Sequence, residues 1–123
     1  MRDQLKVASF GQPGSFTHQA SDNYFKSLVP NYSFFSHFED VVEAVETEKA
    51  DFGVLPIENS STGGITEVYD LLRKGHTQII GEKCLRIEQN LLCVRGASLE
   101  SLRRVYSHPQ GLAQCKAFFK RYP

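Results

Sequence analysis

Three short apolar runs alternate with helical patterns over the first 75 residues, and this alternation restricts the fold more than any other feature of the chain. The runs lie at residues 5–10, 32–35 and 52–55, and each is followed by apolar residues at helical spacing. The resulting β-α-β-α-β-α order predicts an α/β fold, with a parallel sheet, right-handed crossovers and helices on its faces. The first run is mostly apolar, so we expect it to be buried on both faces.

The helices are predicted from their apolar faces and from residues at their ends. After the turn at residues 11–14, the first helix begins near Ser15 and repeats apolar residues every four positions. Ser36 and Glu39 have the spacing of a capping box at the start of the second helix. Gly75 is expected to end the third helix as a C′ residue. The apolar faces comprise Phe16, Ala20, Tyr24 and Leu28 in the first helix, Val41, Val42 and Val45 in the second, and Ile65, Val68, Tyr69 and Leu72 in the third.

The pattern changes after residue 78. Residues 78–94 read as a long β-rich stretch, 98–104 as a short helix and 105–107 as a short strand. Pro109 suits the first turn of a last helix, whose apolar residues include Leu112, Cys115 and Phe119. We therefore expect residues 1–78 to form a first α/β lobe and residues 79–123 to begin a second, incomplete lobe. The chain is expected to be an N-terminal fragment.

Composition excludes several classes of partner. Lys plus Arg equals Asp plus Glu at 14 each, so no basic field exists to recruit nucleic acid or an anionic membrane. No apolar run approaches the roughly 20 residues that span a bilayer, and no secretory signal is visible. Three cysteines without CxxC spacing disfavour a disulfide framework or a zinc site, and they favour a reducing, cytoplasmic location. We expect the cysteines to lie in the core.

Polar and glycine-rich residues follow the first and third predicted strands. Gly11 and Gly14 permit a tight backbone turn, and Ser15 and Thr17 add hydroxyl donors at a helix start. The segment lacks both the GxGxxG pattern and the lysine of a P-loop, which disfavours nucleotide binding. A glycine turn with a serine cap explains the same residues without any ligand.

The second junction, residues 58–64, is denser in donors. Asn59, Ser60, Ser61 and Thr62 can donate hydrogen bonds without carrying charge, and the N–H groups of Gly63 and Gly64 are open. Such a strand-loop-helix junction can hold a small anion, although a loop capped by Thr62 is the alternative. The Glu58 carboxylate would repel an anion, unless burial keeps it protonated or it accepts hydrogen bonds from nearby donors and orients them. Glu58 could also cap a helix.

The third junction places Ser107 and Gln110 at a helix start, with His108 between them. A lone histidine is more often a packed or surface residue than a catalyst. The other three histidines have no metal-ligand spacing such as HExxH, so no metal site is predicted. Parallel strands end at one edge of a sheet, so the junctions together predict a cleft of neutral donors for a small carboxylate.

Four segments in order give the chain its resemblance to the prephenate dehydratase family. Gly11–His18 resembles the family's opening G-x-x-G-[ST]-[FY]-[ST] loop, and residues 51–60 resemble its central P-I-E-N-S motif. Residues 81–92 are similar to its interlobe strand, and residues 106–115 match its Y-S-H-P-Q-x-[LF]-x-Q-C segment. The resemblance covers about residues 6–122, which is nearly the whole chain.

The resemblance implies a two-lobed fold like a type II periplasmic binding protein, with the first lobe nearly complete here and the second partial. It implies a carbon–oxygen lyase that converts prephenate to phenylpyruvate in phenylalanine biosynthesis, without metal or organic cofactor, and a homodimer or larger assembly. Glu58, Asn59 and Ser60 are then the candidate catalytic residues. The candidate substrate-binding residues are Gly11, Ser15, Thr17, Gly63, Ser107 and His108.

Two departures from the family pattern shape the expectation for the chain by itself. Gln89 stands where many members carry a histidine, and the family's Thr-Arg motif, with its catalytic threonine, is absent. We therefore expect the 123-residue chain alone to be inactive. A non-catalytic carboxylate-binding module, an arogenate dehydratase and a nucleotide-dependent oxidoreductase remain alternatives, the last disfavoured by the missing dinucleotide fingerprint.

Overall fold

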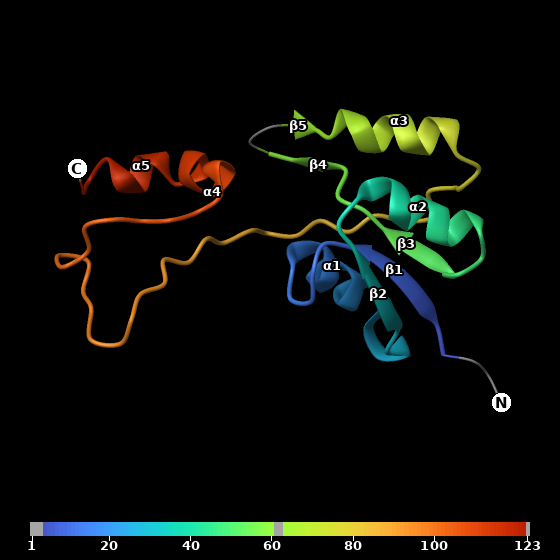
Figure 1. The fold of residues 1–123 in the computed structure, drawn as a ribbon, viewed down its shortest axis with the longest axis horizontal. Coiled ribbons are helices and arrows are strands. Elements are labelled where there is room, and N and C mark those ends of the chain that lie inside the picture. Colours follow the sequence, from blue (N-terminus) through green and yellow to red (C-terminus); the bar gives the residue numbers. More distant parts are fainter. Residues whose placement is uncertain (1–3, 61–62, 123) are drawn as a thin grey trace. The chain divides into compact units, whose positions relative to one another are not determined.

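The computed structural model describes residues 4–60 and 63–122 (Figure 1). They fall into two compact units, one ending at Leu85 and the other beginning at Arg86. The boundary expected from the sequence lies earlier, between residues 78 and 79, and it stays a prediction about the family's lobes. Within the described residues no helix is long and apolar enough to cross a membrane.

The first unit is built on a three-stranded parallel sheet. The strands are β1 (Lys6–Phe10), β2 (Asn31–Phe35) and β3 (Phe52–Val54), in the spatial order β2-β1-β3. Parallel pairing of β1 with both neighbours confirms the predicted α/β class. The central strand β1 is buried at Val7, Ala8 and Ser9, as its mostly apolar sequence predicted.

The two faces of the sheet are covered by different helices. Ala8 packs in a cluster with Val41 and Ala44 of α2 (Phe38–Glu46). On the other face, Phe25 of α1 (Phe16–Phe25) lies against Phe52, which pairs with Val7 in the sheet. Neighbouring residues of a strand point to opposite faces of the sheet. The pair Val7–Phe52 therefore lies on the face covered by α1, and the pair Ala8–Gly53 on the face covered by α2. This arrangement matches the prediction of helices on both faces.

A third helix, α3 (Thr66–Lys74), packs beside α2 in the first unit (Figure 1). Its Val68 is completely buried, as the apolar pattern predicted. The end of α3 is tied to α2 because the backbone N–H of His76 donates to Glu46 Oε1 at 2.8 Å. Gly75 allows this approach, since a Cβ there would come within 2.6 Å of the same oxygen.

Replacing Glu46 with alanine is expected to lower the free energy of unfolding of the first unit by about 0.5–1.5 kcal/mol, because the His76 amide loses its acceptor. Glu46→Gln keeps a carbonyl oxygen at the same reach and should lose less than half as much. Urea unfolding of the three proteins measures the difference. Equal losses in the two variants would mean that the carboxylate charge, rather than the hydrogen bond, is what matters.

Two local predictions for the helices were wrong. The buried face of α1 is formed by Ser21 and Phe25, one position beyond the predicted stripe. The second helix is capped at His37, without a side-chain hydrogen bond, so Ser36 and Glu39 do not form a capping box. Glu39 lies instead in the first turn, where its charge favours the positive end of the helix. The prediction that α3 ends at Gly75 is confirmed; Gly75 is its C-cap, in an extended conformation.

The predictions for the second half of the chain were largely wrong. Residues 78–94 have no regular secondary structure, 98–101 form turns rather than a helix, and 105–107 are not a strand. A β-rich sequence becomes a strand only when a neighbour pairs with it, and no pairing within the described residues involves 78–94. The last helix is divided at Cys115 into α4 (Pro109–Gln114) and α5 (Lys116–Phe119).

Candidate functional site

Two of the three predicted junctions leave the same edge of the sheet. In the parallel register Phe10 lies beside Phe35, and Ser9 lies beside Val54, so the carboxyl ends of the strands are together. The chain turns at once after β1, where the Gly11 N–H donates to the Phe35 carbonyl at 2.8 Å. This edge is where open α/β sheets bind ligands, so residues that follow its strands are candidates for a binding site.

The first junction is a glycine turn that leads directly into the cap of α1. Gly11 and Gly14 have φ values of 97° and 86°, a region that side chains disfavour. The Ser15 Oγ accepts the backbone N–H of His18 at 3.2 Å, which makes Ser15 the N-cap. The Ser15 hydroxyl proton is still able to donate, and Thr17 lies half-buried in the first turn of α1. This geometry is therefore compatible with Ser15 as a helix cap and also with its hydroxyl as a donor to a ligand.

The second junction is a small hairpin instead of the open loop that the sequence suggested. Strand β4 (Glu58–Asn59) pairs antiparallel with β5 (Gly63–Gly64), and the Ile65 N–H donates to the Ile57 carbonyl at 2.8 Å. Asn59 is half-buried and Ser60 is exposed at the turn. Pairing across the hairpin uses some of the backbone groups that the sequence analysis assigned to a ligand. Ser61 and Thr62 lie outside the described residues, and the N-cap of α3 is Ile65 rather than Thr62.

Glu58 is exposed and has a specific neighbour. The Tyr69 hydroxyl, from α3, lies 3.5 Å from Glu58 Oε2 and donates toward it. Tyr69 also covers Gly64, where a Cβ would lie 2.5–2.9 Å from the ring and the hydroxyl. Of the explanations offered for Glu58, the geometry favours a carboxylate that accepts hydrogen bonds, because the side chain is not buried.

Tyr69 is a site neighbour that the sequence analysis missed. Its position in the helical pattern assigned it to the apolar face, yet 43% of its surface is exposed. The signal that could have identified it is a hydroxyl-bearing aromatic on a helix that directly follows a glycine pair. A glycine opposite an aromatic ring allows the ring to lie against the backbone.

Behind the first junction, Tyr32 of β2 donates to Asp22 Oδ1 at 2.7 Å. Burial raises the pKa of Tyr32 above its ordinary value of 10.0, and the hydrogen bond and charge of Asp22 act in the same direction. Ser21 opposes this effect by lowering the pKa. The folded chain therefore keeps Tyr32 protonated at a pH where an unfolded chain begins to ionise it.

We expect the first unit to lose stability as the pH rises above about 10, because the unfolded state releases the Tyr32 proton more readily than the folded state. The stability is fully present below the unfolded pKa and is lost as the pH passes through the raised, folded value. Urea unfolding between pH 8 and pH 11 measures this slope. Tyr32→Phe should flatten it, and Tyr106→Phe, at an exposed position in the second unit, should leave it unchanged.

The third junction lies in the second unit and is a compact helix start. His108 is the N-cap of α4, and its Nδ1 accepts the Gln110 N–H at 3.1 Å. Pro109 occupies the first turn of that helix, as predicted. Ser107 lies close to Gly111, where a Cβ would meet the Ser107 Oγ at 2.5 Å. Gln89, at the position where many family members carry histidine, donates to Gln114 Oε1 at 3.0 Å.

Comparison with known proteins agrees with the four sequence segments. The family model for prephenate dehydratase matches residues 7–123. The chain belongs to the prephenate dehydratase family. The match covers nearly all of the chain and includes the residues of all three junctions.

Curated relatives carry the same family domain within longer proteins. The chain is 40% identical over 122 residues to the bifunctional chorismate mutase/prephenate dehydratase of Escherichia coli K12, with 96% of the chain and 31% of that protein covered. It is 39% identical over 128 residues to the protein of the same name from Buchnera aphidicola subsp. Schizaphis graminum, with 98% and 33% covered. The chain spans about one third of the length of the curated relatives that it matches.

A solved structure shares part of the fold. The prephenate dehydratase from Streptococcus mutans superposes with a TM-score of 0.53 at 31% identity. The superposition covers 57% of this chain and 36% of that one. The mixed α/β fold with a parallel sheet is therefore shared with a member of the family.

The cysteines of this family member are not in the core, contrary to the prediction. Cys84 and Cys93 are exposed, Cys115 is half-buried, and all three are free thiols. The apolar surroundings of Cys84 and Cys93 in the sequence did not lead to burial, because residues 78–94 are not packed into a sheet. Among residues 4–60 and 63–122, no group of three or more His, Cys, Asp or Glu side chains could hold a metal ion.

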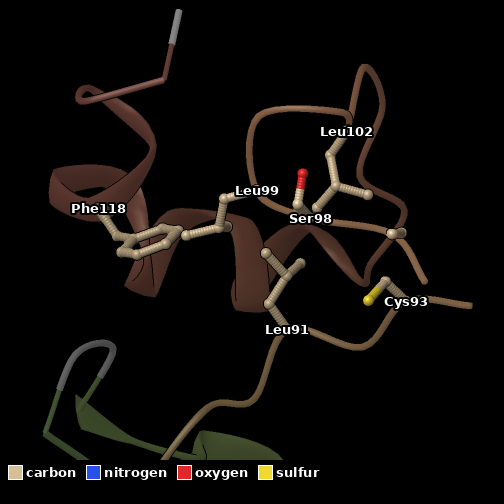
Figure 2. Close-up of a pocket in the computed structure, with 7 residues that line it drawn as sticks. Leu91, Cys93, Ser98, Leu99, Leu102 and Phe118 are labelled. Atoms are coloured by element: carbon tan, nitrogen blue, oxygen red, sulfur yellow. The ribbon is translucent and has the colours of Figure 1, made fainter. Parts of the chain in front are cut away.

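A hollow in the described part of the second unit is lined by apolar side chains and contains none of the predicted site residues. Its volume is about 410 Å³. Figure 2 shows Leu91, Leu99 and Phe118 turned toward one another, with Cys93 and Ser98 farther round the rim. Ala97 and Leu102 complete the lining. Because these side chains offer almost no charge, the hollow does not suit a dicarboxylate.

Proposed function

We propose that this chain functions as part of a prephenate dehydratase, which converts prephenate to phenylpyruvate with loss of water and carbon dioxide. The observation that carries the proposal is the family match over residues 7–123. The Pro-Ile-Glu-Asn-Ser segment at residues 56–60 supports it, since it lies at the carboxyl end of β3. The names of the curated relatives support the same activity.

The proposed chemistry fits residues that donate hydrogen bonds without carrying charge. Prephenate has two carboxylates and a ring hydroxyl, and aromatisation of the ring drives the reaction. An enzyme that bound the departing carboxylate equally well in the ground and transition states would not accelerate its loss. Neutral donors can orient the carboxylates without overstabilising them, and an acid near the hydroxyl would supply the proton for its departure.

We assign roles to the site residues on this basis. Gly11, Ser15, Thr17 and Gly63 are proposed to line the substrate site with backbone and hydroxyl donors. Glu58, Asn59 and Ser60 are proposed to orient the substrate and the catalytic groups. The Tyr69 hydroxyl supports this role for Glu58, because it gives the carboxylate a hydrogen-bond donor at 3.5 Å. Ser107 and His108, in the other unit, are assigned to the site by the family resemblance.

The finer architecture is also proposed from the resemblance. We infer two lobes of the type II periplasmic-binding-protein kind, with residues 1–78 in the first and residues 79–123 beginning the second. A homodimer or larger assembly is proposed for the intact protein. The roles assigned here require no metal or organic cofactor, since hydrogen bonds and proton transfer suffice for them.

A chimera tests the proposed activity. The segment of the E. coli relative that matches this chain is replaced by the chain, and formation of phenylpyruvate from prephenate is followed. We expect activity within about tenfold of the E. coli protein. The control is the same chimera with Glu58→Ala and Asn59→Ala together, for which we expect no turnover.

The 123-residue chain alone is expected to give no turnover but to bind prephenate weakly. Binding would be seen as shifts of the backbone amide signals of Gly11 and Gly63 in an NMR titration. A correctly folded chimera without activity, combined with the absence of any such shifts, would contradict the proposed function. Phenylpyruvate formation by the chain alone would contradict only its expected inactivity.

A further inference from the structure

His18, to which the sequence analysis gave no role, is enclosed by protein groups on several sides. Its Nδ1 accepts the backbone N–H of Gly14 at 2.9 Å. Its Nε2 lies 3.5 Å from Asp22 Oδ2. The ring packs edge-on against Tyr32 and Phe34, with centroids 4.7 Å and 5.0 Å away. Only 22% of the side chain is exposed.

These contacts determine the tautomer of the neutral His18 ring. Because Nδ1 accepts the Gly14 N–H, the neutral imidazole carries its proton on Nε2, which faces Asp22. Asp22 in turn accepts the Tyr32 hydroxyl at 2.7 Å through its other oxygen. Both ring nitrogens therefore face protein groups, and a continuous set of polar contacts joins the glycine turn to α1 and β2.

The contacts between the turn and the helix are reciprocal. Ser15 Oγ accepts the His18 N–H at 3.2 Å, while the His18 ring accepts the N–H of the residue just before Ser15. The arrangement resembles a capping box in which histidine replaces the usual Glu or Gln at the third helical position. Gly14 precedes the N-cap of α1, so its N–H has no acceptor within the helix and is satisfied by the His18 ring instead.

We propose that His18 is the positioning residue of the glycine turn, residues 11–15, and that its Nδ1 acceptor keeps this turn in the conformation that receives a substrate carboxylate. The identity of the ligand, prephenate, rests on the proposed function. His18 itself is not proposed to contact the substrate. The Nε2 contact with Asp22 selects the tautomer that leaves Nδ1 free to accept.

Two substitutions at His18 separate the acceptor from the rest of the ring. His18→Asn and His18→Leu both remove the aromatic contacts and the Nε2–Asp22 contact. Asn places an oxygen where Nδ1 stood, whereas Leu places a methyl group there. Asn is the poorer helix former of the two, so helix propensity acts against the expected result. If His18→Asn retains more function or amide protection than His18→Leu, the difference is therefore due to the hydrogen-bond acceptor.

The first readout is independent of the ligand. In the 123-residue chain we expect long-range NMR correlations of His18 to show the proton on Nε2. Amide exchange at Gly14 should be about 3- to 10-fold faster in His18→Leu than in the unmodified chain, and nearly unchanged in His18→Asn. A ring protonated on Nδ1 alone, or equal exchange rates in the two variants, would overturn the inference.

The second readout uses prephenate in the chimera with the E. coli relative. We expect His18→Leu to raise KM about 10-fold with little change in kcat, and His18→Asn to stay within about 3-fold of the parent. Equal KM values for the two variants, at equal stability in urea, would also overturn the inference. If the parent chimera has no activity, the proposed function fails, and the Gly14 exchange comparison alone decides the role of His18.

Discussion

Replacing Asn59 with aspartate is expected to reduce kcat/KM for prephenate by roughly 5- to 1,000-fold in the chimera with the E. coli relative. The substitution is isosteric, so it changes the charge and one donor group while leaving the shape of the side chain intact. A new negative charge about 4 Å from a substrate carboxylate costs about 1–4 kcal/mol, depending on the local dielectric. Half-burial of Asn59 favours the upper part of that range.

The matched control is Asn31→Asp, at the first residue of β2. Asn31 lies at the amino end of the parallel sheet, whereas the predicted site lies at the carboxyl end. The same charge change there should leave kcat/KM within about 2-fold of the parent, because an exposed charge farther away than a Debye length of about 8 Å is largely screened. Thermal unfolding of both variants checks that neither is simply unfolded. Similar losses of kcat/KM in the two would remove Asn59 from the site.

The local sequence predicted the first unit well, because its elements depend mainly on local periodicity. Residues 52–55 form a short apolar run. Such a run becomes a strand when a neighbouring strand is available to pair with it. The alternation of strands and helices then predicts which faces are covered, since crossovers between parallel strands are almost always right-handed. Val41 and Val68 are completely buried for this reason.

The features that the sequence did not predict depend on contacts between distant residues. The hairpin of β4 and β5 has only two residues in each strand, too few for a periodic pattern. Residues 78–94 have a β-rich composition, but composition does not supply the partner that a strand needs. The same limit explains why the burial of Cys84 and Cys93 was predicted wrongly.

The candidate site was predicted as residue types at strand ends, and its internal contacts were not. Ser15 was predicted at the start of a helix and is the N-cap there. Tyr69 and His18 were not predicted, because each contacts the site through a backbone position made accessible by a glycine. The sequence reveals the glycines, but only the fold shows which side chain lies against each one.

Gly53→Ala is expected to lower the free energy of unfolding of the first unit by about 1–3 kcal/mol. Gly53 lies in β3, directly beneath α2, and a Cβ there would come within 3.0 Å of both Val41 Cγ1 and Val45 Cγ2. Such a distance is too short for two carbon atoms, whose optimal separation is about 3.5–4.0 Å, so the two valine side chains, or α2 with them, must shift away from the new methyl group. Urea unfolding measures the loss as a shift of the midpoint at an unchanged slope.

A double-mutant cycle tests whether this close packing is the cause. Val45→Ala removes one of the two methyl groups that the new Cβ would meet, at the cost of some buried apolar surface. If steric overlap causes the loss, Gly53→Ala should cost at least about 0.5 kcal/mol less in the Val45→Ala background than in the parent chain. Strict additivity would show instead that α2 does not press on Gly53. The glycine that precedes the Pro-Ile-Glu-Asn-Ser segment would then need an explanation other than packing against α2.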